Sequence, residues 1–382
     1  MVVSTNTLLT SGSRYQSLDV LRGLTVALMI IVNTPGSWST NFSPFLHAPW
    51  HGITITDLVF PSFLFVVGNA MAFSLIKLKE RGAQVYFQKV IKRTLIIFLI
   101  GLLLTAFPFF RIADSGLVPF DFSKIRIMGV LQRIALCYGL AATLVYFFKL
   151  RVCMGIGASL LLIYWGIMYF FGDQGPDPYS LEGNAARRLD LWLIGAGNLY
   201  RGEGIPFDPE GLLSTLPAMV NVLAGYGVGS YIRKNAGNSK TVRSLFIIAL
   251  AFLVLGYVWD IFFPINKKIW SSSFVLVSVG YVTALLGVLV FVLELKKLKG
   301  WAYFFEVFGK NPLILYVLSG VLVRLMLMVP VGHLSLKTWI YEQFYSSFLP
   351  PKMASLTFAI SFMLLIWLVG WVMDKRKWYI KV

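Results

Sequence analysis

The chain has 382 residues, of which 57% are hydrophobic and only 13% are charged, roughly half the charged share of an ordinary globular protein. Such a chain cannot cover a core with polar surface, and its apolar and aromatic content excludes disorder. The formal net charge of +17 would suggest nucleic-acid binding in a soluble protein. In a membrane protein, however, basic residues collect in cytoplasmic loops.

Ten apolar runs are long enough to cross a bilayer as helices, which takes about 20 residues each. In chain order they cover 18–36, 54–76, 94–110, 127–148, 152–171, 211–231, 244–263, 271–293, 303–328 and 353–373. The first run follows a polar stretch and lacks a small-residue cleavage site, so we expect it to be retained. The sequence therefore predicts an all-α polytopic membrane protein of about ten transmembrane helices, built as one domain over residues 1–382.

Lysine and arginine are unevenly shared between the two sides of this arrangement. Twenty-one of the 34 basic residues fall on the side of the two termini, and ten fall on the other side. Since cytoplasmic loops carry the excess of Lys and Arg, we expect both termini in the cytoplasm. This topology accounts for most of the charge, and no nucleic-acid partner is expected.

Two connections on the outer side have unusual compositions. Segment 37–53 lacks Lys, Arg, Asp and Glu, yet it contains two of the three histidines. Segment 172–210 is the longest connection, rich in Gly, Pro and Asp, and we expect a long periplasmic loop there. Loops of this length in compact proteins are usually functional or disordered.

Several polar side chains fall inside the apolar runs, where an ionisable group costs several kcal/mol unless it is paired or hydrated. Asp19 and Arg22 share one helix face, which predicts an ion pair or a ligand contact. Asn33 is either a packing residue or a functional one. Asp57 fits an N-terminal helix cap as well as a functional role. Arg133 is expected to face an anion or cavity, or to snorkel to the outer interface.

Histidine can act as acid, base or nucleophile near neutral pH. His47 lies in the uncharged segment beside Trp50, and Asp57 follows ten residues later. If this segment folds back on the bundle, the carboxylate can orient the imidazole, as in catalytic His–Asp pairs. The spacing alone leaves a purely structural pair open. Cys137 and Cys153 form neither a disulfide framework nor a metal-ligand pattern, and common hydrolase and nucleotide-binding motifs are lacking.

The sequence resembles the heparan-α-glucosaminide N-acetyltransferase family of transmembrane acyltransferases. The resemblance rests on SLDVLRG (17–23), IVN (31–33), HAPWHGITITDLVFP (47–61), GVLQR (129–133), DPEGLLST (208–215) and NPLILY (311–316). Lysosomal members carry an N-terminal luminal domain and an extra leading span, whereas this chain begins almost at the first motif. Pro49 and His51 also stand where the family has Ser and Asn. These departures favour a bacterial-type member in the inner membrane.

The resemblance implies transfer of an acetyl group from cytoplasmic acetyl-CoA to the amine of a glucosamine-type sugar, or a glycan fragment, on the periplasmic side, without a metal. His47 would be the base or the acetyl-accepting nucleophile, Asp57 its orienting carboxylate and Asn33 an oxyanion donor. Expected coenzyme A contacts are Arg22, Arg93, Gln132, Arg133 and Asn311, and expected sugar contacts are Trp50, Asp208 and Glu210. O-acylation of a periplasmic glycan or lipid, and transport of an unmodified sugar, remain alternatives. A homodimer also stays open.

Overall fold

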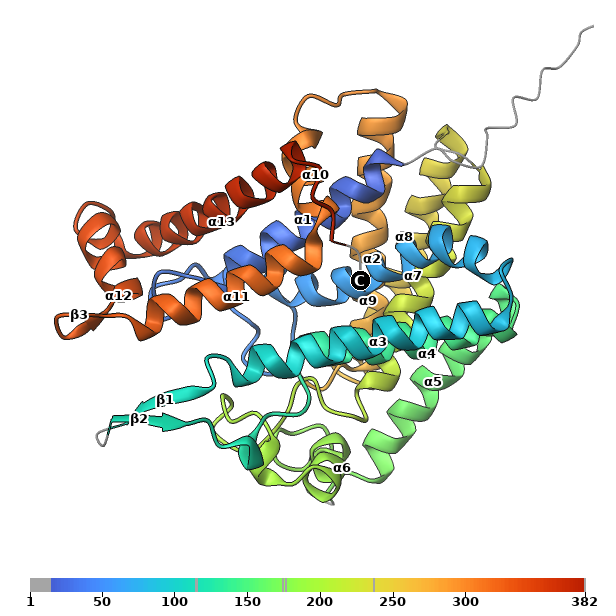
Figure 1. Cartoon of the computed structure of the whole chain (residues 1–382). Coiled ribbons are helices and arrows are strands. Elements are labelled where there is room, and N and C mark those ends of the chain that lie inside the picture. The colour runs from blue at the N-terminus through green and yellow to red at the C-terminus, as the bar shows by residue number, and fades with distance from the viewer. Residues whose placement is uncertain (1–14, 114–115, 174, 176, 236–237, 381–382) are drawn as a thin grey trace, which may run out of the picture.

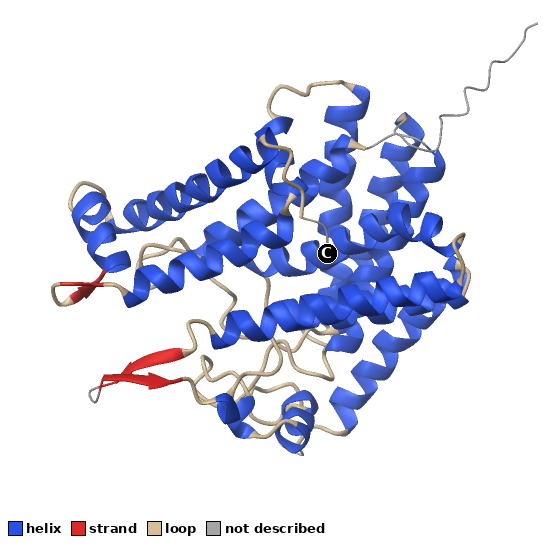
Figure 2. Ribbon diagram, viewed as in Figure 1, coloured by secondary structure: helices blue, strands red, loops and turns tan. Residues whose placement is uncertain are grey.

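The computed structural model describes residues 15–113, 116–173, 175, 177–235 and 238–380, and helices dominate it (Figure 1). The helices are α1 (Gln16–Asn33), α2 (Ile55–Lys79), α3 (Ala83–Ala106), α4 (Val130–Phe147), α5 (Leu150–Phe170), α6 (Ala185–Leu193), α7 (Thr215–Asn235), α8 (Ser239–Asp260), α9 (Ser272–Leu289), α10 (Ala302–Lys310), α11 (Pro312–Met328), α12 (Leu336–Tyr341) and α13 (Pro351–Lys375). Two antiparallel hairpins join β1 (Phe110–Ala113) to β2 (Gly116–Pro119) and β3 (Pro330–Val331) to β4 (Leu334–Ser335) (Figure 2).

Each of the ten predicted runs contains helix, but fewer helices qualify as membrane spans. Among the described residues, seven helices are long and apolar enough to cross a membrane, namely α1, α2, α4, α5, α8, α9 with its π-helical extension Val290–Leu295, and α13. The pair α10 and α11 would add an eighth if it forms one bent span. Both α3, with basic residues in its first half, and the Gly- and Asn-containing α7 fall outside this set.

The apolar run predicted at 303–328 contains two helices, α10 and α11. The chain bends by 83° between α10 and α11. Asn311 at the break has a non-helical backbone, with φ −131° and ψ 50°. The next residue, Pro312, supplies no N–H and disfavours helical geometry in the residue before it. The proline therefore starts a second helix rather than continuing the first.

The outer surface of the bundle is apolar along several helices. On α3, the residues Leu95, Leu99 and Leu103 recur every four positions and are all exposed, so they form one outward face. Leu250 and Val254 of α8 are exposed in the same way. Contiguous exposed apolar surface of this kind is unfavourable in water, but it suits a hydrocarbon environment. With the seven candidate spans, this identifies an integral membrane protein.

Glycines let α2 and α7 approach closely. A Cβ atom at Gly68 of α2 would lie 1.9 Å from the carbonyl oxygen of Val222, and one at Gly225 of α7 would lie 2.0 Å from that of Phe65. Backbones this close leave no room for a side chain. Gly68 and Gly225 therefore permit the close packing of α2 on α7.

The chain alternates between two ends of the bundle (Figure 1). The connections α2–α3, α4–α5 and α9–α10 lie at the end where α1 begins and α13 finishes, and α7 ends and α8 begins there too. The break between α10 and α11 also lies at this end, since Asn311 bonds Trp378 and Ile380 after α13. Both hairpins and α6 lie at the opposite end. This arrangement agrees with the alternation on which the charge-based topology depends. The assignment of the first end to the cytoplasm stays a prediction.

Candidate active site

The carboxylate of Asp57 is fixed at the start of α2. Thr54 caps this helix: its hydroxyl accepts from the backbone N–H of Asp57 (3.4 Å), and the Asp57 carboxylate accepts from the Thr54 N–H (2.9 Å). This reciprocal capping box satisfies two backbone donors at the helix start. The local sequence Thr-Ile-Thr-Asp thus fixes the orientation of the Asp57 carboxylate through the helix cap itself.

The same carboxylate binds the imidazole of His47. Asp57 Oδ1 lies 2.6 Å from His47 Nδ1, while Oδ2 accepts from the N–H of Ala48 (3.1 Å) and the hydroxyl of Thr54 (3.0 Å). Asp57 is 1% exposed, whereas 42% of the His47 side chain is exposed. The uncharged segment 37–53 therefore folds back on the bundle as the sequence suggests.

This geometry sets the chemistry of the imidazole. Because an ionised carboxylate only accepts hydrogen bonds, the neutral ring carries its proton on Nδ1 and its lone pair on Nε2. Nε2 has no hydrogen-bond partner among the described residues. The pair can accept a proton or attack an electrophile at Nε2 while Asp57 stabilises the resulting cation.

The segment carrying His47 is held in place by two later connections. Trp50 donates through Nε1 to the carbonyl of Tyr179 (3.0 Å) and packs edge-to-face on Phe207. Lys268 donates to the carbonyl of Pro49 (2.9 Å). The connection predicted as a long loop at 172–210 contains α6 and a 3₁₀ turn at Ala196–Asn198. Two later connections thus pack against the segment that carries His47.

Asp208 and Glu210 belong to a buried ion-pair cluster centred on Arg126. The guanidinium donates to both oxygens of Asp208 (2.9 and 2.7 Å) and to Glu210 (2.6 Å). Burial disfavours the charge on Glu210, but Lys267 and Arg126 outweigh it and lower the pKa of that carboxyl. Sequence reasoning missed Arg126, whose only local signal is its position just before the GVLQR motif. Sugar binding by the two acids stays a prediction.

Arg133 is completely buried, so the alternative of snorkelling to the interface is wrong. Its Nη2 donates to the Gly211 carbonyl (3.0 Å) and to the Ser214 hydroxyl, and the guanidinium stacks on Trp270. Its Nε and Nη1 atoms, and Nε2 of Gln132, have no partner among the described residues. Buried donors without partners are uncommon in native structures, so both side chains have free capacity for a ligand.

Arg22 and Arg93 make their contacts with residues other than the His–Asp pair. Arg22 binds the Gly309 carbonyl (2.9 Å) and pairs with Asp19 (3.3 Å), which confirms the predicted ion pair. Arg93 stacks on Tyr138 and lines a basic pocket between α2 and α3.

Two predicted residues sit at helix ends. The Asn311 amide binds the backbone of Trp378 and Ile380 (both 3.0 Å), after α13. Asn33 is the exposed last residue of α1, and no hydrogen bond joins it to His47 in the described part of the chain. The oxyanion and coenzyme roles of these residues stay predictions. Within the described ranges, no group of three or more His, Cys, Asp or Glu could hold a metal ion.

The fold and this site define an integral membrane protein with a candidate acid–base pair at one end of its helical bundle. A profile described as heparan-alpha-glucosaminide N-acetyltransferase, catalytic, matches residues 14–256, and the chain belongs to this family. The matched segment contains the His–Asp pair and the Arg126 cluster.

Two named relatives support the assignment. The heparan-alpha-glucosaminide N-acetyltransferases of Mus musculus and Homo sapiens are 28% and 27% identical to this chain. Each match covers 80% of this chain, and 53% and 52% of the relative respectively. The chain therefore spans about half the length of the curated relatives it matches.

Proposed function

We propose that the protein is a transmembrane acyltransferase that moves an acetyl group from cytoplasmic acetyl-CoA to the amine of a glucosamine-type sugar. The acceptor binds on the periplasmic side of a bacterial inner membrane. One observation carries the proposal: a buried carboxylate holds the imidazole of His47 with Nε2 free, inside the segment matched by the acetyltransferase family.

The chemistry needs a base or a nucleophile at the acetyl carbon. In the direct route, the amine nitrogen bonds to the thioester carbon while His47 Nε2 takes the amine proton. The carbon–sulfur bond then breaks, the imidazolium of His47 gives its proton to the departing sulfur, and coenzyme A leaves as the thiol. In the covalent route, Nε2 attacks the thioester carbon, the carbon–sulfur bond breaks, and coenzyme A leaves as the thiolate while Asp57 stabilises the acetyl-imidazolium cation. The amine nitrogen then attacks the acetyl carbon, the bond from that carbon to Nε2 breaks, and the proton released by the amine converts the thiolate to the thiol.

Buried donors in the first turn of α4 suit the donor substrate. Gln132 and Arg133 retain unused hydrogen-bond donors away from solvent, where a preorganised donor stabilises developing negative charge most strongly. The end of the bundle with the α2–α3 connection carries most basic residues. Lys and Arg bind phosphates well, so this end fits the entry of an anionic thioester.

O-acylation of a glycan or lipid is the second candidate, and one observation favours it. Asp208 and Glu210, expected to bind the sugar ammonium, are already paired with Arg126. A hydroxyl acceptor needs no such carboxylate. The same donor and the same histidine would then give an ester instead of an amide.

The test uses the full chain in nanodiscs with radiolabelled acetyl-CoA and glucosamine. We expect His47→Ala to lose acetylation, while His333→Ala, at the exposed turn between β3 and β4, keeps it. Turnover of His47→Ala near the wild-type rate would refute the catalytic role. Mass spectrometry separates amide from ester. In sealed vesicles that contain the protein, accumulation of unmodified sugar without coenzyme A would indicate a transporter. Label retained on His47 without acceptor would select the covalent route.

A further inference from the structure

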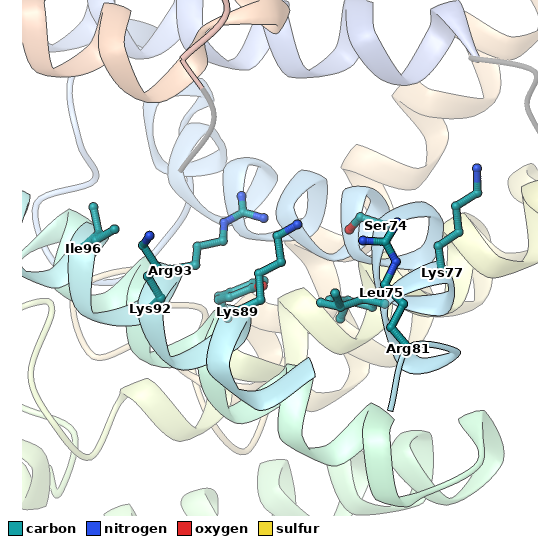
Figure 3. A pocket seen from close by; sticks show the side chains of 10 residues that line it. Ser74, Leu75, Lys77, Arg81, Lys89, Lys92, Arg93 and Ile96 are labelled. Atoms are coloured by element: carbon teal, nitrogen blue, oxygen red, sulfur yellow. The ribbon is translucent and has the colours of Figure 1, made fainter. Parts of the chain in front are cut away.

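A basic pocket of about 330 Å³ lies between the end of α2 and the first half of α3. Asp57 lies in the first turn of α2, so the pocket is at the other end of that helix from the His–Asp pair. Five cationic side chains line it: Lys77, Arg81, Lys89, Lys92 and Arg93. Figure 3 shows their charged ends following one another along the pocket. In the proposed transfer reaction the basic residues at this end only attract an anionic donor in general, and no individual role falls to Lys77, Arg81, Lys89 or Lys92.

The charge in this pocket is not compensated by its own walls. Its other lining residues are Ser74, Leu75, Leu78, Ile96 and Tyr138, so no carboxylate lines it. The buried Nε of Arg93 has no hydrogen-bond partner among the described residues. Like charges that converge in a concave site repel one another and attract a multivalent anion. Phosphate groups meet this requirement, because Lys and Arg form strong charge-assisted hydrogen bonds with them.

A second hollow adjoins the basic pocket on the outward face of α3. It shares Lys92 and Ile96 with the pocket, and its walls include Phe87, Ile91 and Leu95. Ile91 and Leu95 begin the exposed apolar stripe that continues along α3. A charged pocket thus passes directly into an apolar, bilayer-facing groove. The two parts match an amphiphile with an anionic head and a hydrocarbon chain.

We propose that this composite site binds an anionic phospholipid. The phosphate head occupies the basic pocket, and an acyl chain lies along Ile91 and Leu95 of α3. Juxtamembrane basic clusters attract anionic lipids, and basic pockets between transmembrane helices bind their head groups. Coenzyme A also carries phosphates, but its phosphate-bearing end has no hydrocarbon chain to fill the groove. The site stands independently of the proposed transfer reaction.

Binding is tested on the purified full chain by native mass spectrometry with phosphatidylglycerol, phosphatidylcholine, glycerol 3-phosphate and coenzyme A as probes. The pocket variant is Arg81→Gln/Lys89→Gln/Arg93→Gln. The matched control is Lys296→Gln/Lys297→Gln/Lys299→Gln, which removes three exposed cations of the α9–α10 connection at the same end of the bundle. Circular dichroism and size exclusion check that each variant is folded.

We expect phosphatidylglycerol to bind at least about tenfold more tightly than phosphatidylcholine or glycerol 3-phosphate. The pocket variant should lose this affinity, and the control should keep it. If the triple variant does not fold, Lys89→Gln alone should weaken binding about threefold. Equal affinity of pocket and control variants for phosphatidylglycerol would overturn the proposal. So would loss of coenzyme A binding in the pocket variant with lipid binding unchanged, which would assign the pocket to the donor.

Discussion

At the scale of single residues, Asp57 is the centre of the candidate site. Its carboxylate accepts from four groups: the imidazole of His47, the N–H of Ala48, and both the N–H and the hydroxyl of Thr54. Hydrogen bonds to a carboxylate favour its ionised form. The residue is therefore an acceptor with a fixed direction, which is what an orienting group for histidine requires.

Replacing Asp57 by Asn should impair chemistry more than folding. The amide NH₂ would donate to Nδ1 and move the ring proton to Nε2, which could then no longer accept one. We expect kcat to fall by about 10³- to 10⁴-fold, as in comparable dyads, with little change in KM. Thr54→Ser, which keeps the capping hydroxyl, is the control and should stay near wild type. A higher KM with unchanged kcat would point to a role in substrate binding instead.

Asp190 on α6 predicts a pH-dependent stability. Burial raises the pKa of this carboxyl to about 7, and the negative charge of Asp208 adds to the increase. The hydrogen bond from the Leu212 N–H and the positive charge of Arg133 lower the pKa, but by less. In the unfolded chain the Asp190 carboxyl ionises near pH 4. Between about pH 4 and 7 the unfolded state therefore loses this proton more readily than the folded state, and the free energy of unfolding falls as the pH rises. Asp190→Asn should therefore raise Tm relative to wild type by several degrees at pH 8 and by less at pH 5. A constant difference across thermal melts at both pH values would refute this.

The sequence predicted some of these residue contacts and missed others for a physical reason. The His–Asp pair spans ten positions and includes a helix start, so local rules foresee it. Arg126 meets Asp208 from 82 positions away, and nothing local in the sequence signals that contact. For Arg133 the sequence left two positions open, the membrane interface and the protein interior. Hydropathy does not distinguish them, because an arginine in an apolar run fits either one.

At the scale of elements, helix positions follow from hydropathy, whereas helix geometry does not. All ten apolar runs contain helix, because burial and intrahelical hydrogen bonding both favour it in a membrane. At Asn311-Pro312 the sequence indicates a helix start, which the structure confirms in α11. The angle of 83° between α10 and α11 depends on packing against other helices, which hydropathy does not report. The short α6 was missed because nine amphipathic residues resemble a loop in composition.

The α2–α7 contact should fail if its glycines gain a methyl group. Gly68→Ala forces a Cβ into the backbone of α7 at Val222, and overpacking of this kind costs about 1–3 kcal/mol. Gly227→Ala on α7 is the control, since its nearest neighbour is the flexible side chain of Met154 at 3.5 Å. Thermal unfolding in detergent should show a lower Tm for Gly68→Ala only. Equal Tm values would contradict this close approach.

At the scale of the whole molecule, the two ends of the bundle can be assigned by labelling. Trp192 on α6 and Leu298 between α9 and α10 are 80% and 61% exposed at opposite ends, and the two native cysteines are buried. We expect an impermeant maleimide to label Trp192→Cys in intact cells. Leu298→Cys should react only after permeabilisation. The reverse pattern would invert the topology and place His47 on the cytoplasmic side.

The double role of Asp57 has a consequence for how this protein can change over generations. Because one carboxylate both begins α2 and orients His47, a substitution there alters the loop's anchorage and the imidazole together. Selection for a well-anchored loop would then preserve the carboxylate that orients His47, even if the enzymatic activity itself were not under selection. Conversely, drift toward a different chemistry at this position would first require another residue to take over the helix start.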